Sequence, residues 1–426
     1  MRQVPASGVN LFQSIYALIR EYSEKTGREP LNLSLGNPDT VPPSAILELE
    51  ARYAADPAFA YHTYAEDGNL LRFSEGMVEL HGGIRVQEHP GLKAAPIAGI
   101  KTATAFLPLA CGLHLPDSRR RDSFCVVSNL PSYDVIGTWS QSYLGARRDV
   151  WPLLAEDRMR LNVARLKDAV RAAGDPRIDL VHVVRPGNPA SVGASLEEWR
   201  ELIHFCLERG ARLACDAAYA GLAPSSEHAP LAQAAAKHPE LEWIEMYSVS
   251  KSFSDPGARL GALVGSRDFV DDFLLVKGNS DSGPVPYVMA AYGKFFEDQA
   301  AARRALEAVR GLYERRLSYA AERLREAGLR EACPAAAGFF TLWKVPRRAL
   351  GVDLTSDPRF RGMPRSEAFN RLVASETGIV GVHFEGPGNG GRPEPLIRYA
   401  VCADVLKDSF RRRFEEGLAR LKPEYE

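Results

Sequence analysis

The chain has 426 residues, of which 45% are hydrophobic and 25% are charged, and its formal net charge is −1. That length exceeds what one hydrophobic core usually spans, so we expect two domains in a protein of ordinary globular composition. A net charge near zero gives no general attraction to nucleic acid or to anionic membranes, so neither is expected as a partner.

The chain carries no sign of a membrane or secretory protein. No run of about 18 apolar residues occurs, which excludes a membrane-spanning helix on length. The start of the chain lacks the apolar block and cleavage site of a secretory signal, and residues 10–26 instead predict an amphipathic helix that ends at Gly27. Six cysteines without Cys-x-x-Cys spacing lie mostly in apolar runs, where reduced buried thiols are expected. These features predict a cytoplasmic protein.

Five short apolar runs predict buried strands, at 123–129, 178–186, 211–219, 243–250 and 259–266. They are too apolar for a sheet with one face in water, which suits a mainly parallel sheet that helices cover on both faces. A helix is expected over 196–210, where Ser195 and Glu198 form a capping box and Gly210 is a plausible stop. Alternating strands and helices predict an α/β domain.

From about residue 284 the pattern changes to that of a smaller α+β domain. Residues 291–328 predict one long helix, and a strand at 338–345, a helix at 365–377, a strand at 396–402 and a terminal helix follow. We expect the N-terminal segment to complete this domain. The predicted limits are 1–45 for that segment, 46–295 for the large domain and 296–426 for the small domain.

The residues that carry chemistry are expected in the loops after the strands, at the carboxyl edge of the sheet. Gly99 opens a helix and would offer backbone N–H groups to a phosphate. Tyr133 and Asn188 follow two strands, and Asp216 ends a third, where a buried carboxylate needs a cation or strong donor as partner. Taken singly, each has an ordinary structural interpretation, such as a turn glycine or a core tyrosine.

The stretch "SVSKSFSDPGARLG", Ser248 to Gly261, places a lysine between two serines and an arginine between two glycines. With Asp216 and Tyr219, this set suits pyridoxal phosphate, which needs a lysine for a Schiff base, a carboxylate for its ring nitrogen, and donors for its phosphate. The sequence has no His-Glu-x-x-His, no metal-spaced Cys/His pair and no Gly-x-Gly-x-x-Gly after a first strand, so no metal or nicotinamide site is predicted.

This stretch resembles the Ser-x-Ser-Lys-x5-Gly-x-Arg-x-Gly pattern of the fold-type I pyridoxal-phosphate enzymes, specifically the class I/II aminotransferases. The matching residues are Ser248, Ser250, Lys251, Gly257, Arg259 and Gly261. The resemblance covers nearly the whole chain in the same order. It implies pyridoxal 5'-phosphate as cofactor, a large domain with a mainly parallel sheet of the seven-stranded type between helices, and a smaller α+β domain.

The resemblance also implies roles for the loop residues. Lys251 would hold the cofactor as an internal aldimine and move the substrate proton, with Asp216 keeping the pyridine nitrogen protonated and Tyr219 as the third catalytic residue. Tyr219 and Asn188 would bond the phenolic oxygen, and Tyr133 would stack on the ring. The other cofactor-binding residues implied are Ser248, Ser250, Arg259, Gly99, Ile100 and Lys101, with Ser248 and Arg259 on the phosphate.

Substrate residues follow from two further matches. "LNLSLGNPD" resembles a family segment that places Gly36 near the substrate carboxylate, and "PLIRYAV" resembles the strand whose arginine, Arg398, would clamp that carboxylate in bidentate fashion. Asn188 is expected to contact the substrate as well. The chain departs from the family at 188–191, which reads Asn-Pro-Ala-Ser where the family has Asn-Pro-Thr-Gly, and at Ala217 in place of Glu.

Two segments imply a homodimer with shared active sites. Tyr64 resembles the tyrosine that reaches the neighbouring subunit's cofactor phosphate, with Tyr61 as the alternative because the spacing to the following residues is one short. Residues 277–283, "KGNSDSG", resemble an Asn-x-Asp-Ser-Gly segment near the partner's site.

Three functions remain open at this point. The leading interpretation is an aminotransferase that moves an amino group between an L-amino acid and a 2-oxo acid by a ping-pong mechanism, with features similar to the LL-diaminopimelate aminotransferase branch. A lyase, cyclase or oxidase with the same cofactor is the alternative, since one scaffold supports many reactions. A non-enzymatic binding module is the third, although Lys251, Asp216 and Arg259 are all kept.

Overall fold

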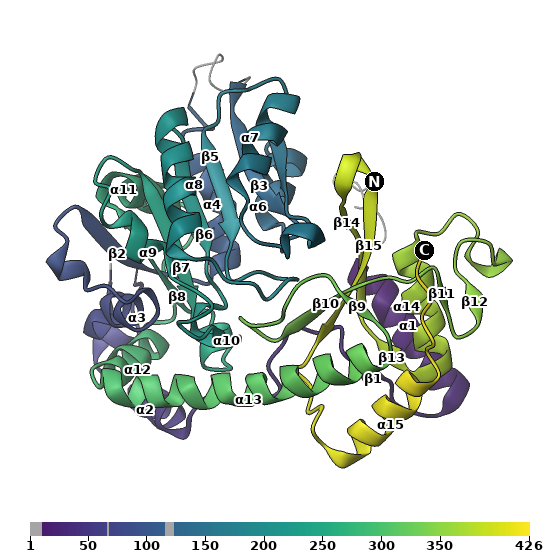
Figure 1. Cartoon of the computed structure of the whole chain (residues 1–426). Helices are drawn as coiled ribbons and strands as arrows, with labels where there is room; N and C mark the ends of the chain where they lie inside the picture. Colours follow the sequence, from purple (N-terminus) through teal and green to yellow (C-terminus); the bar gives the residue numbers. More distant parts are fainter. Residues whose placement is uncertain (1–10, 66–67, 116–122) are drawn as a thin grey trace, which may run out of the picture. The chain divides into compact units, whose positions relative to one another are not determined.

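The computed structural model describes residues 11–65, 68–115 and 123–426. The chain forms two compact units (Figure 1). Unit 1 consists of the residues up to 37 together with 313–335 and 339–426, and unit 2 consists of 38–312 and 336–338. The predicted domain limits of 1–45, 46–295 and 296–426 stay a prediction.

Unit 2 is built around a seven-stranded sheet with the order β2-β8-β7-β6-β5-β3-β4. The strands are β2 (Leu92–Ile97), β3 (Cys125–Leu130), β4 (Arg147–Pro152), β5 (Leu180–Val184), β6 (Arg212–Asp216), β7 (Trp243–Ser248) and β8 (Gly261–Ser266). Neighbours from β4 to β7 pair in parallel, whereas β8 runs antiparallel to both β7 and β2. The prediction of an α/β fold with a mainly parallel sheet is confirmed.

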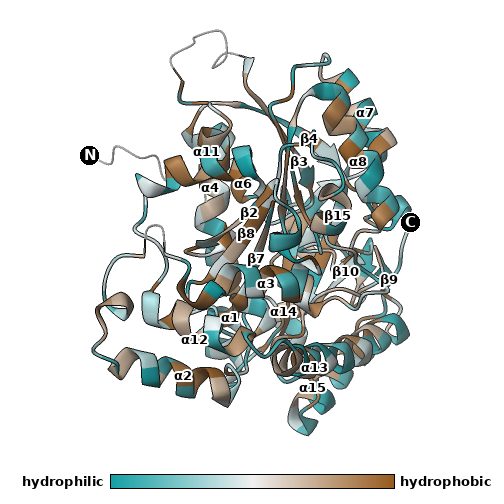
Figure 2. Ribbon diagram, turned by 90° about the vertical axis from the view of Figure 1, so that its left-hand side faces the viewer, coloured by the Kyte–Doolittle hydropathy of each residue, from teal (hydrophilic) through white to brown (hydrophobic). Residues whose placement is uncertain are grey.

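The helices of unit 2 cover this sheet because successive strand residues point to opposite faces. Ile244 and Met246 of β7 join a buried cluster with α4 and α11, while Glu245 and Tyr247 face α9 and α3. Figure 2 shows the strands in mainly hydrophobic colours and hydrophilic residues on the surrounding helices. The helices of eight or more residues are α2 (Ser44–Ala55), α3 (Phe73–Gly82), α4 (Ile100–Ala110), α7 (Val163–Ala172), α8 (Leu196–Arg209), α11 (Arg267–Gly278) and α12 (Pro286–Phe296), and shorter ones are α6 (Val135–Gly137), α9 (Leu231–Ala235) and α10 (Val249–Ser252).

Local signals fixed the ends of α8 correctly. The Ser195 hydroxyl accepts from the Glu198 backbone N–H and the Glu198 carboxylate accepts from the Ser195 backbone N–H, which is the predicted capping box. Gly210 ends the helix with φ of +59°, a backbone conformation that costs glycine little. Both expectations are confirmed.

The prediction of a single helix over 291–328 is wrong. The chain forms α12, which ends at Phe296, and a separate helix α13 (Gln299–Glu326). The carboxylate of Asp298 accepts a hydrogen bond from the Ala301 backbone N–H at 2.9 Å, so this residue caps the start of α13. An aspartate inside a continuous helical pattern was the available signal for this break.

Unit 1 contains an antiparallel sheet with the order β14-β15-β10-β9. Its elements are β9 (Arg330–Glu331), β10 (Phe340–Lys344), β14 (Val382–Pro387) and β15 (Pro393–Ala400), with the short pairs β1 (Leu31–Asn32) with β13 (Ile379–Val380) and β11 (Arg348–Ala349) with β12 (Val352–Asp353), and the helices α1 (Leu11–Thr26), α14 (Arg365–Thr377) and α15 (Asp408–Ala419). The predicted helices at 10–26 and 365–377 and the predicted strands at 338–345 and 396–402 are thereby confirmed in type and place. Across the described part of the chain, no helix has the length and apolar character needed to cross a membrane.

Candidate active site

The register of the sheet brings three loops of unit 2 to one edge. Ser248, at the end of β7, pairs with Gly261 at the start of β8, and Gly261 pairs with Ile97 at the end of β2. The loop after Ile97, the turn that contains Lys251 and the loop that contains Arg259 therefore leave the sheet side by side. This edge is where ligands bind in open α/β sheets.

A candidate anion site lies where the first of these loops enters α4. Gly99 has φ of +89°, and no side chain caps the backbone N–H groups at the start of the helix. A Cβ at Gly99 would collide with the Arg259 guanidinium, so only glycine lets the two come this close. A free helix start with its positive dipole end and a guanidinium beside it suits a phosphate.

The turn with Lys251 is short and hydroxyl-rich. Ser248 is the N-cap of α10, and its hydroxyl oxygen accepts from the Ser250 backbone N–H at 3.1 Å. The two serine hydroxyls lie 2.9 Å apart. Ser248 and Ser250 are buried, whereas Lys251 is half-buried. The predicted anchoring residues are therefore held by one local turn.

Asp216 ends β6 with only 8% of its surface exposed. One carboxylate oxygen accepts from the Ala218 backbone N–H at 3.0 Å. Burial raises the pKa of this carboxyl to about 6, and the Ala218 hydrogen bond and the Lys251 charge oppose that rise. A cationic ring nitrogen would stabilise the ionised carboxylate further, since a buried charge needs a partner.

Asn188 and Tyr219, which follow β5 and β6, are brought into contact. The Asn188 amide donates to the Tyr219 hydroxyl at 3.3 Å, and both residues are buried. Val184 and Asp216 pair in register, which places the two following loops next to each other. The Asn188 amide and the Tyr219 hydroxyl therefore lie together at the edge of the sheet.

Tyr133 and Tyr64 are exposed, unlike the buried Asp216, Asn188 and Tyr219. The Lys101 ammonium lies 5.9 Å from the centre of the Tyr133 ring, so these two predicted cofactor residues meet. Tyr64 is 79% exposed. The next residue, Ala65, donates its backbone N–H to the Ser282 carbonyl at 3.1 Å, which ties the Tyr64 segment to the segment 277–283.

Three polar contacts that sequence reasoning missed hold the loop between Lys251 and Arg259. The Ser252 hydroxyl donates to His81 Nε2 at 2.8 Å, because burial lowers the pKa of His81 to about 4 and its Nδ1–H donates to the Met77 carbonyl. The Thr40 hydroxyl bonds that of Ser254 at 2.7 Å, and the Tyr292 hydroxyl donates to Asp255 at 2.9 Å. These pairs join distant parts of the sequence and carry no local motif.

The predicted substrate residues Gly36 and Arg398 belong to unit 1, where both contact Phe340. The Arg398 guanidinium lies 4.3 Å from the centre of the Phe340 ring and donates to the Ser34 carbonyl at 2.6 Å. A Cβ at Gly36 would lie 2.9 Å from the tip of the same ring. Arg398 is 6% exposed, so its charge is held in a fixed, largely buried geometry.

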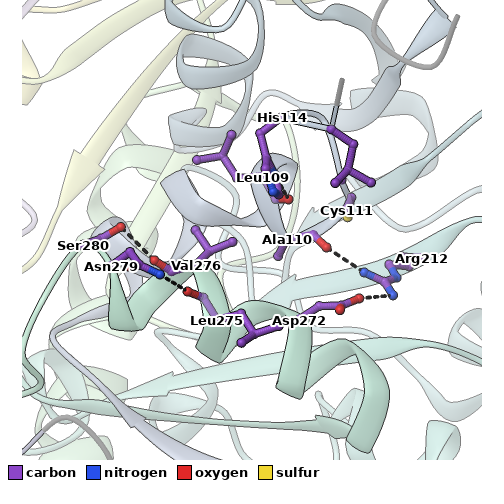
Figure 3. Close-up of a pocket in the computed structure, with 12 residues that line it drawn as sticks. Leu109, Ala110, Cys111, His114, Arg212, Asp272, Leu275, Val276, Asn279 and Ser280 are labelled. Atoms are coloured by element: carbon purple, nitrogen blue, oxygen red, sulfur yellow. Dashed lines mark hydrogen bonds and ion pairs between the residues drawn. The ribbon is translucent and has the colours of Figure 1, made fainter. Parts of the chain in front are cut away.

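A pocket of about 660 Å³ elsewhere in unit 2 contains none of the predicted site residues (Figure 3). The carboxyl-terminal ends of α4 and α11 form it. Its half-buried cation, Arg212, donates to the Ala110 carbonyl at 2.8 Å and pairs with Asp272 and Glu242. The size of this pocket therefore does not mark the chemical site.

The residues of unit 2 fit pyridoxal phosphate. A space next to Gly99 that a Cβ would fill, a guanidinium and a free helix start provide for the phosphate. The buried Asp216 provides for the ring nitrogen, the contact of Asn188 with Tyr219 for the phenolic oxygen, and Lys251 for the covalent link. In the described part of the chain, no group of three or more His, Cys, Asp or Glu side chains could hold a metal ion.

Comparisons with known proteins agree with this chemistry. The family "Aminotransferase class I and II" matches residues 28–408. The LL-diaminopimelate aminotransferase of Nitratidesulfovibrio vulgaris (strain Miyazaki F) is 26% identical over 400 residues, which cover 93% of this chain and 91% of the relative. That of Syntrophobacter fumaroxidans is 26% identical over 420 residues, covering 97% and 95%.

Solved structures share the fold. An aspartate aminotransferase single mutant from Thermus thermophilus aligns with a TM-score of 0.75 and 18% identity over 99% of both chains. The aromatic aminotransferase of Pyrococcus horikoshii aligns with a TM-score of 0.73 and 19% identity, over 95% of this chain and 98% of that one. Because the family match spans most of the sequence, this chain belongs to the class I and II aminotransferases and is a pyridoxal-phosphate-dependent enzyme that transfers amino groups.

Proposed function

We propose that the predicted residues of unit 2 hold the cofactor and carry out the proton transfer. Lys251 forms the covalent link and moves the proton at the substrate Cα, and Asp216 stabilises the charged ring nitrogen. Bound pyridoxal phosphate supplies an electron-accepting ring for this reaction. The observation that carries the proposal is the buried Asp216 carboxyl, whose pKa responds to the Lys251 charge at the edge of the same sheet.

The phosphate is assigned to the start of α4. Gly99, Ile100 and Lys101 contribute the helix start, and Arg259, Ser248 and Ser250 contribute the side chains. A Cβ at Gly99 would collide with the Arg259 guanidinium, and this close approach of the guanidinium to the helix start supports the assignment. The Asn188 amide and the Tyr219 hydroxyl are assigned to the phenolic oxygen, and Tyr133 to the ring face.

The substrates are an L-amino acid and a 2-oxo acid, which react in turn by a ping-pong mechanism. Arg398 binds the α-carboxylate with Gly36 and Asn188. The support is that Arg398 is buried against the Phe340 ring, which removes freedom from its guanidinium before any ligand arrives. Relatives named LL-diaminopimelate aminotransferase make LL-diaminopimelate the first amino donor to test.

A screen of amino donors tests this function. The holoenzyme is mixed with single L-amino acids, LL-diaminopimelate included, while the cofactor absorbance is followed. A true donor changes the spectrum, and 2-oxoglutarate or pyruvate restores it. Ammonia or peroxide released without an oxo acid would instead indicate the lyase or oxidase alternative, which the aminotransferase relatives do not favour.

We also propose a homodimer in which Tyr64 reaches the partner's cofactor phosphate. Tyr64 is exposed, and its neighbour Ala65 is bonded to Ser282, so both segments that the family resemblance gives to the partner's site lie together in unit 2. The ion pair of the buried Lys277 with Asp281, at 2.7 Å, holds the second segment. The burial of all six cysteines supports a cytoplasmic location, where thiols are kept reduced.

Subunit mixing tests the shared site. Lys251→Ala and Tyr64→Ala proteins, each with little activity alone, are mixed under conditions that exchange subunits. In an equimolar mixture half of the dimers are hybrids, and each hybrid has one of its two sites intact, so activity should return to about a quarter of that of the wild type. Lys251→Ala mixed with Asp216→Asn is the control, since both residues serve one site and no hybrid is intact. No recovery in the first mixture would contradict the role of Tyr64.

A further inference from the structure

The residue directly after Lys251 bonds a histidine from a distant helix of the same unit. The Ser252 hydroxyl oxygen and His81 Nε2 lie 2.8 Å apart, although the two residues are 171 positions apart in the sequence. Ser252 ends α10, the short helix that contains Lys251, and His81 lies in the last turn of α3. The contact therefore ties the turn of the proposed linking lysine to α3.

This hydrogen bond has a fixed direction because His81 is neutral. His81 and Ser252 are both buried, and burial lowers the pKa of His81 to about 4. The neutral ring has one N–H group, and Nδ1 uses it to donate to the Met77 carbonyl at 3.2 Å. Nε2 is consequently an acceptor, and the Ser252 hydroxyl donates its single proton to it rather than to the Ser248 carbonyl, which lies 3.2 Å from the same hydroxyl oxygen.

The surroundings of the contact fix where the histidine ring can lie. A Cβ at Gly221 would lie 2.6 Å from the Ser252 hydroxyl oxygen and 3.0 Å from His81 Nε2. Gly221 belongs to a short 3-10 helix and its φ is outside the left-handed range, so glycine is needed there for space. The ring centres of Tyr247 and Phe253 lie 5.7 and 6.3 Å from that of His81. The acceptor nitrogen is thus held by close packing.

We propose that His81 is a positioning residue for Lys251. His81 holds the last residue of α10 through the Ser252 hydroxyl, while the Ser248 hydroxyl holds the start of this helix through the Ser250 backbone N–H. Lys251 lies between these two anchors, so the direction in which its side chain leaves the backbone is set from both ends. The inference rests on the proposed function, in which Lys251 forms the covalent link with the cofactor and moves the Cα proton.

Addition of pyridoxal phosphate to the full-length, cofactor-free chain tests this role. His81→Leu keeps a buried side chain of similar volume but has no acceptor for the Ser252 proton. We expect the rate constant of link formation, followed by absorbance, and kcat for amino transfer each to fall about 10-fold. The Kd of pyridoxamine phosphate, whose amine cannot link to Lys251, should stay within about threefold because the proposed phosphate contacts are unchanged. Unchanged rates with lowered stability would show a purely structural contact and overturn the proposal.

His81→Gln is the matched control for the leucine variant. Glutamine is close to leucine in size, and its amide oxygen can accept the Ser252 proton, so link formation should stay within about threefold of the wild type. A glutamine variant as slow as the leucine variant would contradict a role for the acceptor.

Ser252→Ala removes the donor from the same hydrogen bond. It should lower the rate of link formation about as much as His81→Leu, and the double variant should be no slower than the slower single variant. Single effects that multiply in the double variant would overturn the proposal, because the two residues would then act separately.

Hydrogen exchange in the cofactor-free chain provides a readout that does not depend on activity. Exchange at the backbone amides of residues 249–253 should become faster in His81→Leu and in Ser252→Ala, and unchanged exchange would overturn the anchoring of α10. A wild-type chain that forms no link with pyridoxal phosphate, or a Lys251→Ala chain that still forms one, would instead overturn the proposed function. Link formation through Lys251 at the same rate in the wild type and in His81→Leu would overturn the role of His81 alone.

Discussion

The two ends of α4 contain similar residues, but the arginines near them make different contacts. Each end has a glycine with positive φ, Gly99 at +89° and Gly112 at +84°, and each lies near an arginine. At the carboxyl-terminal end Arg212 donates to the Ala110 carbonyl and pairs with Asp272 (Figure 3), and it also pairs with Glu242. At the amino-terminal end the Arg259 guanidinium donates one hydrogen bond, to the Pro256 carbonyl at 3.0 Å.

The difference distinguishes Arg259, the cation that we propose binds the cofactor phosphate, from Arg212, a cation with a structural role. Arg212 compensates the negative end of a helix and two carboxylates, so its hydrogen-bonding capacity is used within the chain. Arg259 is exposed beside a positive helix end, an arrangement that favours an anion and gives the folded chain little by itself. The pocket at the carboxyl-terminal end of α4 reflects how side chains pack there and does not mark a site of chemistry.

Loss of the lysine at the active edge should have the largest effect. Lys251→Ala is expected to lower the rate of amino transfer by about 10³-fold or more, because both the covalent link and the proton transfer are removed. The measurement is single-turnover transfer followed by cofactor absorbance. His114→Ala, in the pocket at the other end of α4, is the control and should leave the rate unchanged. A His114→Ala variant with a clearly lower rate of amino transfer would contradict the difference between the two ends of α4.

Neutralising the two arginines should give opposite results. Arg259→Gln should raise the cofactor Kd by about 10- to 100-fold with little change in the stability of the cofactor-free chain. Arg212→Gln should lower that stability by about 1–2 kcal/mol, since it removes two partly exposed ion pairs and the hydrogen bond to Ala110, and should leave the cofactor Kd nearly unchanged. Cofactor titration and urea unfolding of both variants check this. Equal increases of the cofactor Kd in the two variants would contradict this difference in role between Arg259 and Arg212.

Asp216 predicts a pH dependence for the cofactor-free chain. Its pKa is raised from 3.8 to about 6, so the folded state prefers the protonated carboxyl, and stability from this group is full below about 4 and is lost as pH rises through about 6. The expected loss is up to about 3 kcal/mol. Asp216→Asn should remove this part of the dependence, and the difference between the two unfolding curves isolates it from Glu50 and Glu245, whose pKa values burial also raises. If the stabilities of the two proteins changed with pH in parallel, ionisation of Asp216 would have no cost in stability.

The two glycines of α4 give the smallest expected effects. Gly112→Ala should cost about 1 kcal/mol of stability, the usual price of a side chain at positive φ, with no change in cofactor affinity. Gly99→Ala should cost about as much and also raise the cofactor Kd about 10-fold, because its Cβ displaces the Arg259 guanidinium. Thermal unfolding and cofactor titration separate the two terms. An unchanged cofactor Kd in the Gly99→Ala variant would contradict the anion site that we propose at the amino-terminal end of α4.

The secondary-structure predictions were correct where the sequence signal was local. The capping box of Ser195 with Glu198 and the mainly apolar runs of β5 to β8 depend on neighbouring residues alone, and the structure confirms them. The strand β4 was not predicted, because its residues are half-exposed and include two arginines and an aspartate. The break between α12 and α13 was missed because one capping aspartate was outweighed by a long helical pattern.

The sequence by itself determined the cofactor and predicted the residues that would serve it, because Ser248, Lys251 and Arg259 lie at fixed spacing within one short segment between two strands. Only the tertiary structure decided which distant residues support them. The approach of Gly99 to Arg259 follows from strand register, and the hydrogen bond between Ser252 and His81 joins residues 171 positions apart. Contacts of this kind depend on how elements pack, and packing leaves no fixed spacing in the chain for sequence reasoning to find.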